Sequence, residues 1–206
     1  TQESQYQAEI AAAEVAQQAV FARYREMEPA ALMTDAEAMA TAGRLFRQNC
    51  AMCHGSDGRG AIGFPNLADG DWQWGGSHEQ VMETLANGRM AAMPAWAAAL
   101  GEDGLDEVVA YVLQMSGHGA DPQLAAAGQA RFQMFCVACH GADGKGNPML
   151  GAPNLTDGTW LYGGSAEDIE FALRNGRNGQ MPAFGKNLSE ERRKLLAAYV
   201  RSLSDS

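Results

Sequence analysis

Apolar residues recur at the spacing of a helix in two stretches of the chain. The first runs from Leu105 to Leu113 and the second from Leu195 to Leu203, with apolar side chains at intervals of three and four. Each stretch therefore predicts a helix with one buried face. Alternation of apolar and polar residues, the pattern of a half-buried strand, is nearly absent, so the sequence predicts an all-α fold.

Further helices are predicted from composition and from capping signals. The Ala-rich segments 36–49 and 123–135 favour helix. Ser77 and Ser165 each resemble a helix start, with Gln or Asp three residues later, and the helices that they begin end at Asn-Gly pairs. Residues 5–27 predict one more helix with a sparse apolar stripe, which is either a connecting or docking helix or a solvated extension.

The chain is a duplicated sequence. CAMCHGSDGRG (50–60) is matched by CVACHGADGKG (136–146), and NGRMAAMPAW (87–96) is matched by NGRNGQMPAF (175–184). The offset is 86 at the first pair and 88 at the second. A period this long with only two copies indicates domain duplication rather than a solenoid. Three regions are expected: an N-terminal helix and connector at 1–35, a first domain at 36–117 and a second domain at 118–206.

Two long loops separate the predicted helices of each repeat. They cover residues 55–76 and 141–164 and are rich in Gly and Pro. Loops of this length need something inside the fold to pack around. The helices predicted for each repeat are also too few to bury a sizeable core. An apolar component is therefore expected in addition to the polypeptide.

All four cysteines lie in two Cys-x-x-Cys-His motifs, which are Cys50, Cys53 and His54, and Cys136, Cys139 and His140. A disulfide does not need the histidine. Zinc would be one ligand short in each repeat unless a distant residue supplied it. A thioredoxin-like redox pair needs a βαβ context that a helical sequence lacks. The motif is the attachment signature of haem c, so two covalent haem c groups are predicted, one per domain.

A second iron ligand is predicted in each repeat. Met93 and Met181 each precede a proline at matching places, about forty residues after the motif histidine. Their sulfurs are expected to close the opposite face of the iron, Met93 in the first domain and Met181 in the second. Met90 is a rival of Met93, but Asn178 stands at its counterpart.

Other residues of the predicted haem environment also repeat. Pro65 and Pro153 lie where a loop carbonyl can accept the hydrogen bond of the ligand imidazole. Four side chains are expected at the haem edge or propionates, with plain packing as the alternative for the tryptophans: Trp72, Trp160, Arg89 and Arg177. His78 and His118 have no counterparts and are expected on the surface, with replacement of Met93 as the alternative.

The net charge of −10 is unevenly distributed. Residues 1–120 hold 6 basic and 16 acidic side chains, whereas residues 121–206 hold nine of each. Nucleic acid is an unsuitable partner for such a surface. A basic protein partner is expected to be steered to the first domain, unless the acidity serves only solubility. No run of eighteen apolar residues and no secretory signal is present, although a removed signal or anchor would leave the same sequence.

The repeated loops resemble a known family. GFPNLADGDWQWGGS, MPAW, GKGNPMLGAPNLTDGTWLYGGS and NGRNGQMPAFG are similar to the dihaem subunit (CcoP or FixP) of cbb3-type cytochrome c oxidases, and the resemblance covers residues 42–203. It implies two tandem class I cytochrome c domains, each wrapping one covalent haem c, with an extra N-terminal helix. Soluble dihaem cytochromes of the c4 type share this duplicated layout and are the alternative family.

The resemblance also implies a role in aerobic respiration. In that family the subunit relays electrons from a soluble cytochrome c or a quinol-oxidising complex to the monohaem subunit, and from there to the oxygen-reducing centre. The chain is thus expected to be a carrier rather than an enzyme by itself, since a dihaem peroxidase or a gas sensor needs an open iron position. A periplasmic location is expected, with the family's inner-membrane anchor absent from this chain.

Overall fold

The computed structural model describes the backbone of residues 1–204 and the side chains of that range except at positions 13, 14 and 16–19. Helices dominate, and the small sheet has two strands. The elements in chain order are α1 (Gln2–Arg25), α2 (Pro29–Thr34), α3 (Ala36–Asn49), α4 (Ala51–His54), α5 (His78–Asn87), β1 (Arg89–Met93), α6 (Ala97–Met115), α7 (Pro122–Phe135), α8 (Val137–His140), α9 (Ala166–Asn175), β2 (Arg177–Met181) and α10 (Glu190–Ser204).

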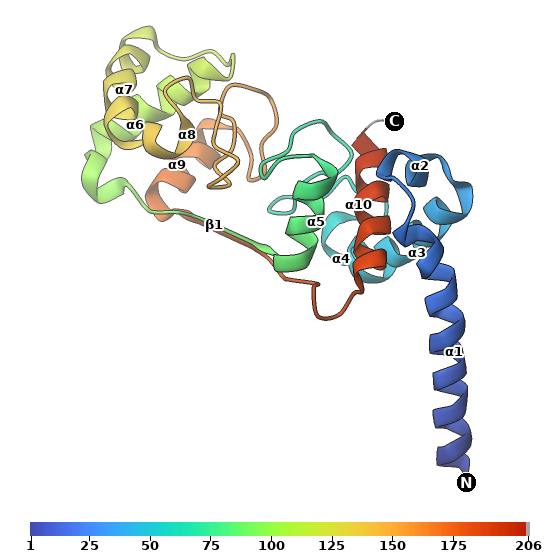
Figure 1. Ribbon diagram of the computed structural model, residues 1–206. Helices are drawn as coiled ribbons and strands as arrows, with labels where there is room; N and C mark the ends of the chain where they lie inside the picture. The colour runs from blue at the N-terminus through green and yellow to red at the C-terminus, as the bar shows by residue number, and fades with distance from the viewer. Residues whose placement is uncertain (205–206) are drawn as a thin grey trace.

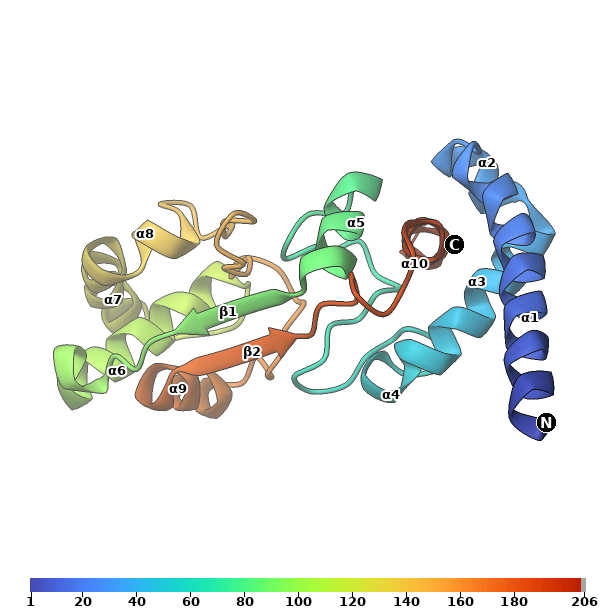
Figure 2. The same ribbon diagram turned by 60° about the horizontal axis from the view of Figure 1, so that its bottom comes forward.

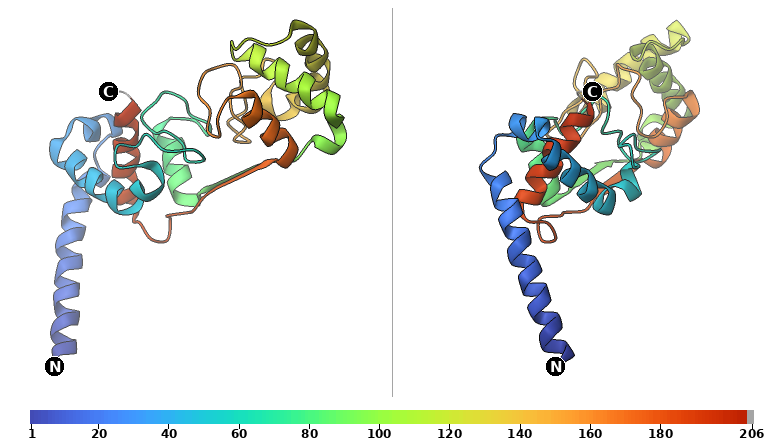
Figure 3. Two further views of the ribbon diagram at one scale, coloured as in Figure 1. Left: turned by 180° about the vertical axis from the view of Figure 1, so that it is seen from behind. Right: turned by 90° about the vertical axis from the view of Figure 1, so that its right-hand side faces the viewer.

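Helix α1 extends away from the rest of the molecule, as Figures 1 and 3 show. The side chains of its N-terminal half are largely exposed. Near its C-terminal end, Phe21 and Tyr24 are buried in one cluster with Leu32 of α2 and Leu195 of α10. The helix was predicted to be either a docking helix or a solvated extension. Both descriptions apply, because its C-terminal end packs on α2 and α10 and its N-terminal half is exposed to solvent. Within residues 1–204, no helix has the length and apolarity needed to cross a membrane.

The helices α5 and α9 begin at the predicted capping residues. The hydroxyl of Ser77 accepts a hydrogen bond from the Gln80 backbone N–H, and the Gln80 side chain accepts one from Ser77 N–H. Ser165 and Asp168 form the same reciprocal pair in α9. These caps satisfy backbone donors that a helix start would otherwise leave without partners.

The strands β1 and β2 pair with each other in antiparallel register, although the sequence does not predict them. The two strands lie side by side in Figure 2. Arg89 lies opposite Met181, and Met93 lies opposite Arg177. Each strand follows a glycine with positive φ, Gly88 or Gly176. The pairing thus brings together the equivalent segments of the two repeats.

The helices that follow the two strands are exchanged between the repeats. Helix α6, from the first repeat, packs against α7 and α9 of the second, whereas α10, from the second repeat, packs against α3 and α5 of the first (Figure 1). Equivalent aromatic pairs show the exchange. Phe46 lies 5.4 Å from Tyr199 between ring centroids, and Phe132 lies 5.3 Å from Tyr111.

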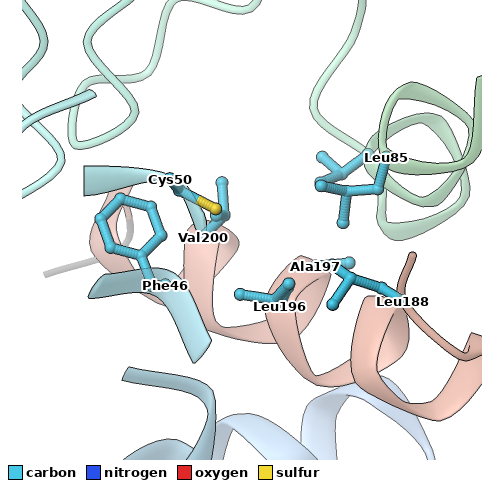
Figure 4. Close-up of a cluster of buried hydrophobic side chains, with 8 residues drawn as sticks. Phe46, Cys50, Leu85, Leu188, Leu196, Ala197 and Val200 are labelled. Atoms are coloured by element: carbon cyan, nitrogen blue, oxygen red, sulfur yellow. The ribbon is translucent and has the colours of Figure 1, made fainter. Parts of the chain in front are cut away.

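Two packing units result, and each draws on both repeats. The first packing unit comprises the end of α1, helices α2–α5 and α10, and the second comprises α6–α9. The core of the first includes Phe46, Cys50, Leu85 and Leu196 (Figure 4), and the core of the second includes Phe132. The ranges 36–117 and 118–206 therefore describe the repeat along the sequence, while the packed cores cross that boundary.

Candidate haem sites

The first Cys-x-x-Cys-His motif lies where α3 ends and the short α4 follows. Cys50 is the C-cap of α3 and is buried, whereas Cys53 is exposed. His54 is only 8% exposed, and its Nδ1 lies 2.9 Å from the carbonyl oxygen of Pro65. The loop can approach this closely because Gly60 has no side chain, since a Cβ there would lie 2.7 Å from that oxygen.

The second motif repeats this geometry. Cys136 is partly buried, Cys139 is exposed and His140 is 9% exposed. The Nδ1 atom of His140 lies 3.1 Å from the carbonyl oxygen of Pro153. Because a carbonyl can only accept, each imidazole donates from Nδ1 and keeps the lone pair on Nε2 for a metal. Each motif therefore presents two thiols and one correctly protonated imidazole.

Burial sets the protonation of several of these groups. It raises the pKa of the Cys50 and Cys136 thiols to about 11, with a smaller contribution from the neighbouring cysteine of each motif. Burial lowers the pKa of His140 more than the bond to Pro153 raises it. The neutral imidazole, which is the form that binds a metal, is thus favoured in the second motif.

The two predicted methionine ligands lie in the strands, on the side facing the cores. Met93 packs against the core of the second packing unit, and Met181 packs against the core of the first. Met90 is 71% exposed, as its place on the opposite side of β1 requires. The sulfur available to a core from β1 is therefore that of Met93 rather than Met90.

The predicted tryptophans lie against the two cores, and the predicted arginines make polar and ring contacts nearby in the sequence. Trp72 packs on the first and Trp160 on the second. Arg89 donates from Nε to Thr84 Oγ1 at 2.8 Å. The indole Nε1 of Trp160 and the Nε of Arg177 are buried without a hydrogen-bond partner among the described residues. Buried donors of this kind need an acceptor.

A haem c group fits these features. Its vinyl groups match the thiol pairs, its iron matches the Nε2 atom of each motif histidine, and its propionates would supply the acceptors that Trp160 and Arg177 lack. Trp74 and Tyr162 were not predicted as site residues. Arg89 lies over the ring of Trp74 at 4.9 Å from its centroid, and Arg177 lies over the ring of Tyr162 at 4.5 Å. The repeated WQW and WLY segments contained the signal for both.

The two histidines that have no counterpart in the other repeat, His78 and His118, have different environments. His118 is exposed and lies 3.0 Å from Ser116 Oγ. The expectation that His78 is a surface residue is wrong, because its side chain is 8% exposed in the first turn of α5 and burial lowers its pKa. Neither residue lies in the core cluster that Met93 contacts.

The loops of the two packing units meet. Gly63 N–H donates to Leu161 O at 2.8 Å, and Thr159 Oγ1 donates to Asp71 Oδ2 at 2.6 Å. Burial raises the pKa of Asp69, and the charges of Asp71 and Asp157 raise it further. The loops that carry Pro65 and Pro153 thus meet at a junction that contains several carboxylates.

Comparisons with known proteins agree with this picture. The family model "Cytochrome C oxidase, cbb3-type, subunit III" matches residues 36–112 and 123–200. A cbb3-type cytochrome c oxidase subunit CcoP of Rubrivivax gelatinosus is 42% identical over 207 residues, which is 100% of this chain and 68% of the relative. A subunit FixP of Azorhizobium caulinodans is 43% identical, over 77% of this chain and 57% of its own. A subunit CcoP of Cereibacter sphaeroides is 41% identical, over 77% and 59%. The chain therefore spans between 57% and 68% of these relatives.

Proposed function

The chain belongs to the family of subunit III of cbb3-type cytochrome c oxidases, and we propose that it is a dihaem electron carrier of such an oxidase. The two family matches and the helical structure confirm the expected fold class of two tandem cytochrome c domains. In the proposed role the chain accepts electrons from a donor cytochrome c or a quinol-oxidising complex. It passes them to the monohaem and catalytic subunits, where oxygen is reduced.

One observation carries the proposal. In both motifs a buried histidine is fixed through Nδ1 by a proline carbonyl, beside a pair of cysteines that are not joined to each other. A zinc site would need a fourth ligand, and a disulfide would make the oriented histidine unnecessary. The arrangement instead suits a covalently held haem whose iron binds Nε2.

Each group of residues has a distinct task in this role. When bound, each haem supplies a one-electron couple. Cys50, Cys53, Cys136 and Cys139 would form the thioether links that keep it in place. His54 and His140 would bind the iron through Nε2, Met93 and Met181 would provide its sulfur ligands, and the Gly- and Pro-rich loops would shield the sites from water. Trp160 and Arg177 would hold the propionates in the second packing unit.

A carrier needs both axial positions of its iron to be filled, because no substrate binds there. Two matched methionine sulfurs, each packed on a core, favour this role over that of a peroxidase or a gas sensor. Attachment of haem by thioether bonds suits an oxidising compartment. We therefore place the chain in the periplasm, anchored to the bacterial inner membrane through a part of the full-length protein outside this sequence.

The haem content tests the proposal directly. The pyridine haemochrome assay should return two haems per chain, and acidified acetone should extract neither. The reduced protein should not change its optical spectrum when carbon monoxide is added. One haem per chain, or extractable haem, would contradict the attachment, and ready binding of carbon monoxide would contradict the role of a saturated carrier.

A further inference from the structure

We propose that Trp74, in the long loop of the first repeat, is a positioning residue for the haem site of the second repeat. Its ring covers Gly151, which lies two residues before Pro153, and the carbonyl oxygen of Pro153 orients the motif histidine His140. The inference rests on the proposed function, which makes His140 an iron ligand. A change in one repeat would then alter the ligand of the other.

The long loops of the two repeats lie side by side between the packing units (Figure 1), and Trp74 packs on Gly151 where they meet. Gly151 is buried, and a Cβ there would lie 2.1 Å from the Cζ2 atom of the Trp74 ring. The neighbouring Gln73 donates a hydrogen bond from Nε2 to the carbonyl oxygen of the same glycine. The first repeat therefore fixes both the α carbon and the carbonyl group of Gly151.

Three consecutive residues connect this contact to the motif histidine. After Gly151, the backbones of Ala152 and Asn147 exchange two hydrogen bonds, of 3.2 and 2.9 Å. The carbonyl oxygen of Pro153 then lies 3.1 Å from His140 Nδ1. Each of the three residues is thus held by a separate contact, and the one at Gly151 comes from the other repeat. Loss of that contact would free one end of the segment that carries the imidazole acceptor.

The Trp74 ring is in turn fixed within its own repeat. The Arg89 guanidinium lies over the ring, 4.9 Å from its centroid, and cation–π attraction favours this placement. Arg89 Nε donates to Thr84 Oγ1 of α5 at 2.8 Å. A continuous line of contacts therefore runs from α5, through Arg89 and Trp74, to the segment 151–153 of the second repeat.

The equivalent contact in the other direction is looser. Gly63 is the counterpart of Gly151, and Tyr162 is the counterpart of Trp74. A Cβ at Gly63 would lie 3.6 Å from Tyr162 Cε1, which is an ordinary van der Waals distance. Both glycines have positive φ, 83° at Gly63 and 63° at Gly151, so alanine strains the backbone at either position. Only at Gly151 would alanine also push an aromatic ring away, so Gly63 provides a matched control.

Proton exchange at the motif histidines of the holoprotein tests the role of Trp74. Reduced haem iron with both axial positions filled is diamagnetic, so ¹⁵N NMR can follow the Nδ1–H groups of His54 and His140. Trp74→Ala should speed exchange of the His140 proton about tenfold, because the segment with its acceptor opens more often. Exchange of the His54 proton should change by less than about twofold. Trp74→Phe keeps a ring against Gly151 and should restore most of the protection.

Alanine at the two glycines measures the effect of backbone strain separately. Gly63 lies two residues before the carbonyl that holds His54, so Gly63→Ala reports at His54 the effect of strain alone. Gly151→Ala should speed exchange at His140 more strongly, because it also displaces the Trp74 ring. Once Trp74 is replaced by alanine, the further effect of Gly151→Ala should fall to that of strain alone. Equal effects of the two glycine variants, each at its own histidine, would overturn the inference.

A milder variant keeps the inference testable if Trp74→Ala does not fold. Gln73→Ala removes only the side-chain hydrogen bond to Gly151 and should give a smaller acceleration at His140. The inference is wrong if neither variant speeds exchange at His140, or if His54 is affected equally. The unaltered protein tests the proposed function separately, since its spectrum should show two iron-bound histidines, and their absence would contradict the proposed function itself.

Discussion

The bond from each motif histidine to a proline carbonyl is the contact that defines the candidate sites at the scale of single residues. Pro65 and Pro153 cannot donate a hydrogen bond, and their rings restrict the backbone around the accepting oxygens. The accepting carbonyl oxygen selects the histidine tautomer that is protonated on Nδ1 and leaves Nε2 free. Both prolines were predicted from the sequence, because the repeat places each of them directly before Asn-Leu in the loop that follows its motif.

Arg177 provides a prediction at the same scale. Its Nε is buried without a partner in the described residues, so we expect it to bind a haem propionate. Replacing Arg177 by glutamine removes a buried positive charge. The loss of this charge favours the oxidised iron over the reduced iron. The potential of the second unit's haem should fall by tens of millivolts, given that about 59 mV corresponds to a tenfold change in a one-electron equilibrium.

Redox titration of the two-haem protein measures this shift. Lys145→Gln is the matched control, since it removes the same charge from an exposed position of the same packing unit. Water screens an exposed charge strongly, so the control should shift the potential less. Equal shifts in the two variants would mean that Arg177 has no special contact with the haem.

At the scale of elements, the sequence predicted what local chemistry determines. The capping pairs of Ser77 and Ser165 fix the starts of α5 and α9 through contacts three residues apart. The exchange of α6 and α10 could not be predicted, because both helices have the same apolar spacing and either would cover either core. The strands were missed for a related reason. Their sequences RMAAM and RNGQM contain no β-branched residue, and only their mutual pairing makes them strands.

The close contact of α6 with α7 provides a prediction on stability. Gly128→Ala would place a Cβ against the backbone of Glu107, which cannot rotate away. Overpacking costs about 1–3 kcal/mol, and the better helix propensity of alanine returns about 1 kcal/mol. We therefore expect a net loss of about 1 kcal/mol in the free energy of unfolding by denaturant. Gln129→Ala, at the exposed neighbouring position, should lose nothing, and an unaffected Gly128 variant would disprove the tight contact.

The contact of α1 with α10 should depend on pH. The backbone N–H of Glu191 and its ion pair with Arg25 lower the pKa of Glu191 from 4.5 to about 2. Because its pKa is lowered in the folded protein, the ionised Glu191 carboxylate stabilises the contact fully above pH 4.5. This contribution disappears as the pH falls toward 2. Protection factors for hydrogen exchange around Phe21 and Tyr24 should therefore fall over this range. Glu191→Gln should show the lower protection already at pH 6, and an unchanged variant would exclude the ion pair as the cause.

The exchange of α6 and α10 between the repeats changes how charge is distributed over the whole molecule. Residues 1–93 and 182–204, which include the first packing unit, hold 11 basic and 14 acidic side chains, whereas residues 94–181 hold 4 and 10. The charge contrast expected from the sequence halves, an acidic first domain beside a neutral second, is therefore lost. Glu79 and Glu83 of α5 line a common pocket with Arg193 and Lys194 of α10. These acids are partly offset by bases that the linear sequence placed in the other domain.

The junction between the two units is the acidic surface best placed for a basic donor. Asp69, Asp71 and Asp157 lie together there, on the loops that also carry Pro65 and Pro153. Asp69→Asn combined with Asp157→Asn should slow reduction by a basic cytochrome c several-fold at low ionic strength. The difference should vanish as salt rises, because steering acts within about a Debye length. Stopped-flow reduction across ionic strength is the measurement.

Asp103→Asn combined with Asp106→Asn is the control for this prediction. It removes the same charge from the exposed surface of α6 and should slow the reaction less. If the Asp103/Asp106 variant is reduced more slowly than the Asp69/Asp157 variant, the donor docks on the second packing unit rather than at the junction.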